Sequence, residues 1–449
     1  MPEAGTSFTR SRAVRVASGL ASFGVVVGFS LVAASPASAA TDADCTPLNT
    51  VDATTGTSTD IQTLLTASTP VICLSGTFTL TAGLTYDYDV TLHGLPSATL
   101  DGDGSYGILT DTGTHTLIVE NLRFTNGNAF DGGAINGYGV LVNNSSFDNN
   151  SATSFGGAIA AYGTEINNSV FEDNTAAFGG AVAAGFVGVS ASTFTQNSAD
   201  ASGGAIYGYG GGIGAVAVDS STFEANTAQF VGGAIASYGS LAVDNSTFVG
   251  NSTEDEFGQG GAIGAESGTV FQSTFLDNSS GSGSAASIYK SSDTELTLRG
   301  NIFAGSVDEH LFADGTGQFA DAGGNLFTTS EATESSLSGV QPSTLFDLTT
   351  LAIFNGATLA DNGGPTFTVA LYAGSPAINA VPADADSLPV DQRGVARPDV
   401  SDAGAYEFVA PVLAATGSVP SGILGGAAAL LLGAGALAVG LARRAVRSR

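Results

Sequence analysis

Short runs of alternating apolar and polar residues, separated by glycine, asparagine and aspartate, make up most of this chain of 449 residues. Alternation with a period of two is typical of β-strands, whereas an amphipathic helix repeats about every 3.6 residues. In one stretch we expect strands over residues 203–207, 215–218 and 221–223, with a corner at residues 219–220. Each repeating unit is therefore predicted to contain three strands and three corners.

A Gly-Gly-Ala-Ile/Val tetrad recurs six times, and a Phe-x-x-Asn motif follows each copy. The steps between tetrads are 24, 23, 24, 29 and 28 residues. The tetrads begin at Gly132, Gly156, Gly179, Gly203, Gly232 and Gly260. The motifs are Phe147/Asn150, Phe171/Asn174, Phe194/Asn197, Phe223/Asn226, Phe248/Asn251 and Phe275/Asn278, and Phe124 and Phe303 extend the aromatic series. A unit of this size must stack on copies of itself to bury its apolar face, which predicts a solenoid.

Three short strands in each turn predict an all-β fold, a right-handed parallel β-helix. The Ile and Val residues of the tetrads and the Phe residues of the motifs would each stack in the interior. The motif Asn residues would form a ladder in which each buried amide bonds the next. The glycine pairs, and the polar pairs at residues 143–144, 167–168, 219–220 and 244–245, are expected at corners that need a left-handed backbone.

Two apolar segments lie at the ends of the chain. Residues 1–40 have a basic start, an apolar run and a small-residue triplet, which predicts a secretory signal peptide cleaved after Ala39 or Ala40. An uncharged apolar run over residues 423–442 precedes four arginines. This run is long enough to span a bilayer, and the arginines would stay in the cytoplasm.

The sequence Leu413-Ala414-Ala415-Thr416-Gly417 precedes the apolar run. Together with the run and the basic tail, it resembles the cell-wall sorting signal of Gram-positive surface proteins, in the LAXTG-type (LPXTG-like) variant associated with class E sortases of actinobacteria. The resemblance implies that a sortase cleaves between Thr416 and Gly417 and joins the threonine carboxyl to peptidoglycan. Proline is commoner at the position of Ala414. The alternative interpretation is a permanent single-pass membrane anchor.

The two cysteines, Cys45 and Cys73, lie near the expected mature N-terminus. In the oxidising compartment that a signal peptide indicates, we expect them to form a disulfide. They would then clasp an N-terminal cap, which an open β-helix needs because its end exposes unpaired backbone. A short helix over residues 60–65 and strands over residues 71–74 and 78–80 are predicted in this region.

The charge of the expected exported part is strongly negative. Residues 41–417 hold 40 of the 41 acidic residues and five of the 12 basic ones, a net charge of −35. Such a surface repels nucleic acid and anionic lipid, so nucleic acid is excluded as a partner. Weak, unspecific binding of Ca²⁺ is the one metal association expected, and no cofactor is predicted.

Two further resemblances concern architecture. The repeats resemble those of polymorphic outer-membrane-type β-helix surface proteins over roughly residues 90–305. The segments 362–366, 375–379, 391–394 and 404–407 are similar to a choice-of-anchor Q domain, which ends many bacterial surface β-helices just before an anchoring signal. The chain departs from that pattern at Ala403, where isoleucine is common, and near Ala380, where a glycine is usual. The resemblances imply location and architecture but no activity.

These features divide the chain into six parts. They are a signal peptide (1–40), an N-terminal cap with the first turns (41–100), the β-helix repeats (101–345), a choice-of-anchor Q-like region (346–409), a linker with the sorting motif (410–417), and a transmembrane segment with its basic tail (418–449).

Catalytic residues are sparse in this sequence. Pectin-lyase-like β-helices include polysaccharide lyases, which need a cationic base beside acids, and glycoside hydrolases, which need paired carboxylates. The candidates are Arg123 with Asp101, Asp103 and Asp131, although residues 101–104 also suit a turn that ends a strand. The three histidines, at positions 93, 115 and 310, lack metal-ligand spacing, so no metal site is predicted.

Tyrosines recur shortly after the Gly-Gly tetrads. Tyr138, Tyr162, Tyr207, Tyr209 and Tyr238 would lie on one side of the rod, as an aromatic ladder for glycans or as packing residues. We therefore expect a secreted, wall-anchored surface protein, adhesin-like or glycan-contacting and non-catalytic. The alternatives are a polysaccharide lyase or glycoside hydrolase, and a passive structural wall protein. A glycan or another surface ligand is the expected partner besides sortase.

Overall fold

The computed structural model describes residues 41–410, except for 211–214, 282–284, 307, 315–316, 331 and 384–386. The predicted signal peptide, the sorting motif and the predicted membrane span lie outside these residues. No helix within the described ranges is long and apolar enough to cross a membrane.

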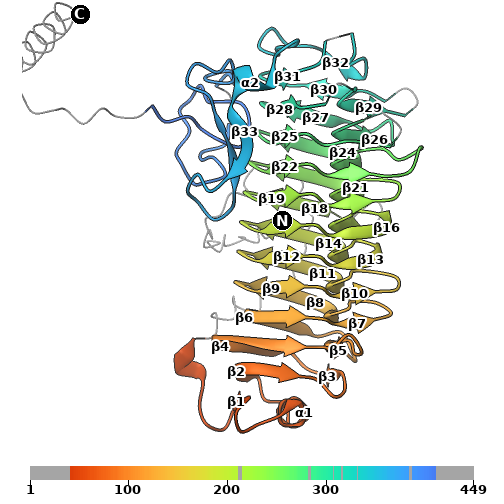
Figure 1. Cartoon of the computed structure of the whole chain (residues 1–449), viewed down its shortest axis with the longest axis vertical. Helices are drawn as coiled ribbons and strands as arrows, with labels where there is room; N and C mark the ends of the chain where they lie inside the picture. The colour runs from red at the N-terminus through yellow and green to blue at the C-terminus, as the bar shows by residue number, and fades with distance from the viewer. Residues whose placement is uncertain are drawn as a thin grey trace, which may run out of the picture. The chain divides into compact units, whose positions relative to one another are not determined.

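The chain coils into parallel turns, and each strand pairs in register with its counterpart in the next turn (Figure 1). Ile135, Ile159 and Val182, for example, lie opposite one another in neighbouring strands. The longest face consists of β2 (Val71–Thr79), β3 (Leu84–Tyr86), β4 (Val90–Asp101), β5 (Leu109–Asp111), β6 (Thr116–Thr125), β8 (Ile135–Asn143), β11 (Ile159–Asn167), β14 (Val182–Ser190), β17 (Ile206–Gly208), β18 (Ala215–Asp219), β21 (Ile235–Asp244), β24 (Ile263–Phe271), β26 (Ile288–Lys290), β27 (Leu296–Arg299), β29 (Leu311–Ala313), β30 (Phe319–Asp321) and β32 (Leu337–Ser338). The predicted parallel β-helix is confirmed.

Two further faces complete each turn. The Phe-bearing strands are β9 (Ser146–Asp148), β12 (Val170–Glu172), β15 (Thr193–Thr195), β19 (Thr222–Glu224), β22 (Thr247–Val249), β25 (Thr274–Leu276), β28 (Ile302–Ala304) and β31 (Leu326–Phe327). A separate sheet contains β7 (Asn128–Ala129), β10 (Ser151–Ala152), β13 (Thr175–Phe178), β16 (Ser198–Ser202), β20 (Thr227–Ala228) and β23 (Ser252–Thr253).

The corners have the backbone conformation that their residues predict. The first glycine of each tetrad has a positive φ, as at Gly179 (+65°), and Asn144 and Asn168 have φ of 49° and 48°. One strand prediction was wrong in its bounds: in the turn of Gly203, the strand begins at Ile206 instead. The reason is that Gly203, at φ 69°, belongs to the corner.

Aromatic rings form a continuous stack inside the coil. The rings of the motif phenylalanines lie nearly parallel, with centroids 4.8 Å apart for Phe171 and Phe194 and 5.0 Å for Phe194 and Phe223. The stack continues through Phe303 to Phe327 and Phe346, beyond the last repeat that the motif marks. These side chains dominate the interior, and burying one large aromatic side chain stabilises the fold by roughly 1.5–3 kcal/mol.

The motif asparagines form the predicted ladder. Asn174 Nδ2 donates to Asn197 Oδ1 (2.9 Å) and to the carbonyl of Phe147 (3.0 Å), and the backbone N–H of Asn174 donates to the same Asn197 oxygen (3.1 Å). A parallel ladder of serine hydroxyls accepts from backbone N–H groups of the preceding turn, as Ser192 Oγ does from Ser169. Buried polar groups are thereby paired along the axis.

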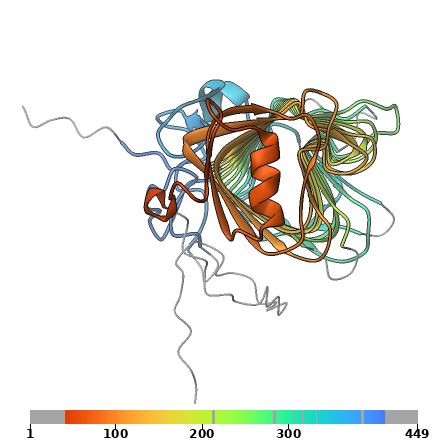
Figure 2. The ribbon, with the colours of Figure 1, turned by 90° about the horizontal axis from the view of Figure 1, so that it is seen from below.

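Helix α1 (Ser58–Thr66) lies across the N-terminal opening of the coil, as Figure 2 shows. Its apolar residues Ile61 and Leu65 are buried against the first turns. The predicted helix is confirmed, but the predicted order of strands is not: β1 (Thr50–Asp52) precedes the helix and pairs with β2, which is one continuous strand.

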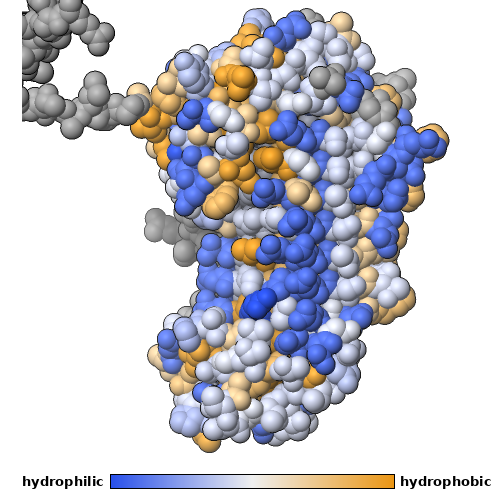
Figure 3. All heavy atoms as spheres, viewed as in Figure 1, coloured by the Kyte–Doolittle hydropathy of each residue, from blue (hydrophilic) through white to orange (hydrophobic). Residues whose placement is uncertain are grey.

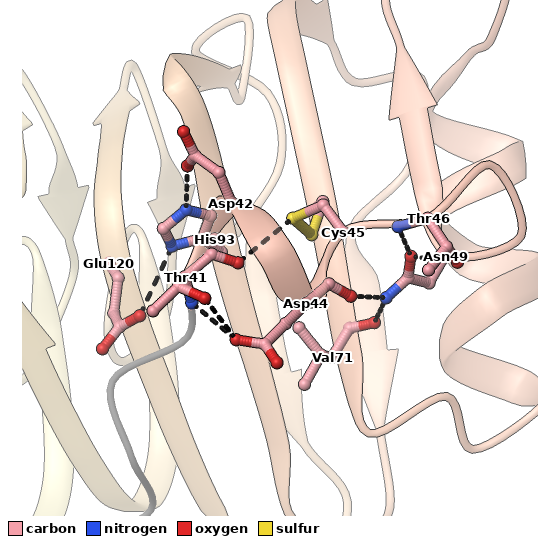
Figure 4. The surroundings of a disulfide bond; sticks show 10 residues. Thr41, Asp42, Asp44, Cys45, Thr46, Asn49, Val71, His93 and Glu120 are labelled. Carbon is pink, nitrogen blue, oxygen red and sulfur yellow. Dashed lines mark hydrogen bonds and ion pairs between the residues drawn. A yellow bond between two sulfur atoms is a disulfide. The ribbon is translucent and has the colours of Figure 1, made fainter.

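A disulfide joins Cys45 to Cys73, with the two Cα atoms 5.8 Å apart, and so ties a 3₁₀ turn (Asp42–Asp44) to β2 (Figure 4). Beside it, His93 lies between Glu120 (Nδ1 to Oε2, 3.4 Å) and Asp42 (Nε2 to Oδ1, 3.2 Å). This arrangement fastens the N-terminal segment to β4 and β6. Within the described ranges, no group of His, Cys, Asp and Glu side chains could hold a metal ion.

The last described segment packs along the side of the coil. It contains α2 (Thr350–Ile353) and an antiparallel pair, β33 (Phe354–Ala360) and β34 (Thr368–Leu371), whose apolar side chains cover Leu276, Ile302 and Leu326. Figure 3 shows apolar residues gathered over this segment, while hydrophilic residues cover much of the neighbouring coil.

Gln392 and Arg397 hold this segment in place. Gln392 Nε2 donates to Thr222 Oγ1 (2.9 Å), and Gln392 Oε1 accepts from Thr247 Oγ1 (2.6 Å). The buried Arg397 guanidinium bonds Glu407 Oε2 (3.0 Å) and Asn245 Oδ1 (3.1 Å). These side chains thus attach the segment to two successive turns.

Candidate functional site: an aromatic hollow

Two of the recurring tyrosines form a stacked pair on the outside of the coil. The rings of Tyr138 and Tyr162 are parallel to within 3°, with centroids 4.9 Å apart, and each side chain is about two-fifths exposed. Each ring covers one face of the other, and Phe186 makes an edge contact with Tyr162 (centroids 5.8 Å apart). Tyr138 and Tyr162 therefore do not present a row of uncovered ring faces, as the predicted glycan-binding ladder would require.

The other three tyrosines belong to an irregular cluster. Tyr207 contacts Phe178 (centroids 5.0 Å apart), Tyr238 (5.5 Å) and Tyr209 (6.2 Å). Burial raises the pKa of Tyr207, with Tyr238 as a second cause. The phenol of Tyr207 therefore stays protonated at neutral pH and can act as a hydrogen-bond donor.

Tyr209 lies across earlier turns of the coil. Its hydroxyl donates to the carbonyl oxygen of Ala161 (2.7 Å), 48 residues earlier in the chain. The step from the tetrad of Gly203 to the next tetrad is 29 residues, longer than the three steps before it. In this longer repeat, Tyr209 lies directly after the end of strand β17 (Ile206–Gly208) and not within it. Its ring tilts by 50° against Phe155, with centroids 5.9 Å apart.

Tyr162, Tyr209 and Phe155 line an open hollow of about 320 Å³, here called the aromatic hollow. The complete lining is Asp131, Asn136, Gly137, Phe155, Ala160, Ala161, Tyr162 and Tyr209. Its volume is at the lower end of the range for small-molecule sites, roughly 300–1,000 Å³. The small residues Gly137, Ala160 and Ala161 let a ligand approach the strands β8 and β11, which lie side by side in Figure 1.

Asp131 brings a carboxylate to the aromatic hollow. One oxygen, Oδ1, accepts from the backbone N–H of Phe155 in the next turn (3.1 Å), which fixes the carboxyl group against the hollow. Burial raises the pKa of Tyr209, and the negative charge of Asp131 adds to this effect. The hollow thus combines aromatic faces, one amide and one carboxylate.

Sequence reasoning missed Phe155 and Asn136 as parts of this site, and Phe178 as a residue that packs beside it. A signal was present, because Phe155 and Phe178 each directly precede the glycine pair of a tetrad. The pairing of residues 155 and 178 across turns places both rings beside the tyrosines (centroids 5.4 Å apart).

Of the catalytic candidates, Asp101 lies close enough to Arg123 to contribute, after Asp148, to its raised pKa, whereas Asp131 lines the aromatic hollow. Arg123 forms a bidentate pair with Asp148 (2.6 and 2.7 Å), and this hydrogen bonding raises the pKa of Arg123. A guanidinium held in this way offers no free base. Asp101 accepts from the backbone of Asp103 (2.9 Å), which has φ of 55°, so these two residues form the turn that ends β4.

Asp131 lines the aromatic hollow instead, directly before the corner at Gly132. The histidines have packing roles. Burial lowers the pKa of His310 to about 3, so its imidazole is neutral beside Ser287 Oγ (3.0 Å). His115 Nδ1 contacts Asp111 Oδ1 (2.8 Å) within a loop.

The fold and repeats define the chain as a repeat-built parallel β-helix. A family model described as the Chlamydia polymorphic membrane protein repeat matches residues 144–162 and 191–209. Each matched segment runs from a left-handed corner through a Phe-x-x-Asn motif and a tetrad to a tyrosine of the aromatic hollow, Tyr162 or Tyr209. No curated protein matches the chain.

Proposed function

We propose that the protein is a cell-surface β-helix that binds glycans without converting them, with the aromatic hollow as the contact site. The observation that carries this proposal is the combination of three aromatic side chains with Asp131 and Asn136 around about 320 Å³. Aromatic faces pack against the apolar faces of sugar rings, while amide and carboxylate groups bond sugar hydroxyls.

Surface location is supported by three features. The matched repeat is named for a membrane protein, and the disulfide between Cys45 and Cys73 suits an oxidising compartment. The predicted signal peptide would deliver the chain there. We also propose that the Q-like region positions the coil next to an anchoring signal, and that a class E sortase transfers Thr416 to peptidoglycan of an actinobacterial wall.

Glycan binding is tested with the full-length protein on a glycan array. We expect Tyr209→Ala to weaken binding about tenfold, because it removes one aromatic wall of the hollow. Tyr372→Ala is the matched control, since Tyr372 is similarly exposed but lies in the C-terminal segment. Equal binding by all three proteins would place the contact elsewhere.

The same samples distinguish the alternative functions. Release of reducing ends or of unsaturated products from a bound polysaccharide would identify a hydrolase or a lyase, and would contradict the non-catalytic proposal. Failure to bind any glycan would favour a passive wall protein.

Wall attachment gives a second test. We expect wall-digesting enzymes to release the wild-type protein and detergent to leave it in place. Thr416→Ala should leave a detergent-soluble form of higher mass, because the sortase needs the threonine carbonyl for transfer. If wild type is itself detergent-soluble and keeps its arginine tail, the chain has a membrane anchor.

A further inference from the structure

We propose that the aromatic hollow selects sugar units that carry a free ammonium group, that is, amino sugars without an N-acetyl group. The inference rests on the proposed function and names the ligand class of the same site. Asp131 would pair with the ammonium group while Tyr209, Phe155 and Tyr162 contact the ring.

The position of Asp131 makes it suited to this role. Its Oδ1 is held by the Phe155 N–H (3.1 Å), so the carboxyl group is fixed by the backbone of a neighbouring turn. A carboxylate has about four lone-pair positions, and this bond uses one of them. Asp131 therefore keeps acceptor capacity at the edge of the hollow.

The cationic side chains of the described ranges have other partners. Arg123 pairs with Asp148, Arg393 with Asp391 and Arg397 with Glu407. Lys290 donates to the carbonyl of Ser292, and Arg299 to that of Pro382. None of these five side chains is therefore the ion-pair partner of Asp131 in the described ranges, and a cationic ligand could take that position.

The aromatic walls favour a cation as well. The face of an aromatic ring carries partial negative charge and attracts an ammonium group within about 6 Å of its centre. The 50° tilt between Phe155 and Tyr209 keeps the two rings from covering each other completely, unlike the parallel Tyr138 and Tyr162. Burial raises the pKa of Tyr209, so its phenol stays neutral beside Asp131.

The net charge of the protein is negative, like the carboxylate of Asp131. The whole chain has a net charge of −29, and 40 of its 41 acidic residues lie in residues 41–417. A cationic glycan would be attracted from a distance, and added salt screens this attraction over about 10 Å at 0.1 M. Long-range attraction alone would not depend on Asp131, which gives the experiment its control.

The test compares a glucosamine tetramer with an N-acetylglucosamine tetramer by calorimetry on the full-length protein. We expect the wild type to bind the glucosamine tetramer about tenfold more tightly. Asp131→Asn keeps an acceptor for the Phe155 N–H but removes the charge, so it should abolish the preference for the glucosamine tetramer.

Glu165→Gln is the matched control, because Glu165 is an exposed acid on β11 outside the hollow. This variant loses the same charge and should keep the preference. Equal binding of both tetramers by wild type, or a preference that survives in Asp131→Asn, would overturn this inference alone. Absence of binding to either tetramer and to the glycan array would overturn the proposed function together with it.

Discussion

Replacing Phe194 by alanine is expected to lower the free energy of unfolding by about 3–5 kcal/mol. The Phe194 ring is fully buried between Phe171 and Phe223, at centroid distances of 4.8 and 5.0 Å. Its removal leaves a cavity whose walls are two rings held by their own turns. Those turns are fixed by backbone hydrogen bonds on both sides, so the cavity cannot close by a local shift.

Guanidinium denaturation followed by tyrosine fluorescence and circular dichroism measures this loss. Val170→Ala is a control in the neighbouring strand, because the Val170 side chain is about two-fifths exposed and its truncation should change stability by no more than about 0.5 kcal/mol. A loss below about 1 kcal/mol for Phe194→Ala would mean that the stack contributes far less than its burial implies.

Gly180→Ala should be at least as damaging, for a different reason. A Cβ atom at Gly180 would lie 2.1 Å from the carbonyl oxygen of Gly204 and 2.5 Å from that of Ser198. Both atoms belong to the backbone of neighbouring strands or corners, so the turns themselves would have to separate. We expect a loss of about 3 kcal/mol or more, at the upper end for overpacking.

Gly163→Ala is the matched control for that substitution. The nearest atom to a Cβ at Gly163 is Phe186 Cβ at 4.0 Å, an ordinary contact. Alanine restricts the unfolded chain more than glycine does, so this variant should be more stable by about 0.4–1 kcal/mol. Thermal unfolding of the two variants should therefore shift in opposite directions, and a similar shift for both would show that the turns are not tightly spaced at Gly180.

The repeated features of the fold were predictable because the same residues recur at one position of each turn. Phe194 and Asn197 have counterparts in every motif, and a stack of turns brings such counterparts together. The tetrad glycines recur for the same reason, since one corner conformation is needed in each turn.

The aromatic hollow was only partly predictable, because it depends on a departure from the repeat. The sequence shows that the step after Gly203 is longer than the three before it, but it does not show where the additional residues lie on the coil. Tyr209 reaches back to Ala161, so a contact spanning 48 residues creates one wall of the site. The sequence placed Asp131 near Arg123 as a catalytic candidate. In the structure Arg123 lies on β6, whereas Asp131 follows β7, which belongs to a different sheet.

The lateral attachment of the C-terminal segment has a mechanical consequence. Tension applied beyond Phe408 would reach the coil through Gln392 and Arg397, at the turns of Thr222, Asn245 and Thr247. Those contacts lie along the side of the rod, so the load would be shared among several hydrogen bonds at once, in shear. The backbone N–H groups of Gly404 and Ala405 also bond Gly300 and Thr274, so the turns next to Phe303 share the load, and pulling would not unwind the coil from its end.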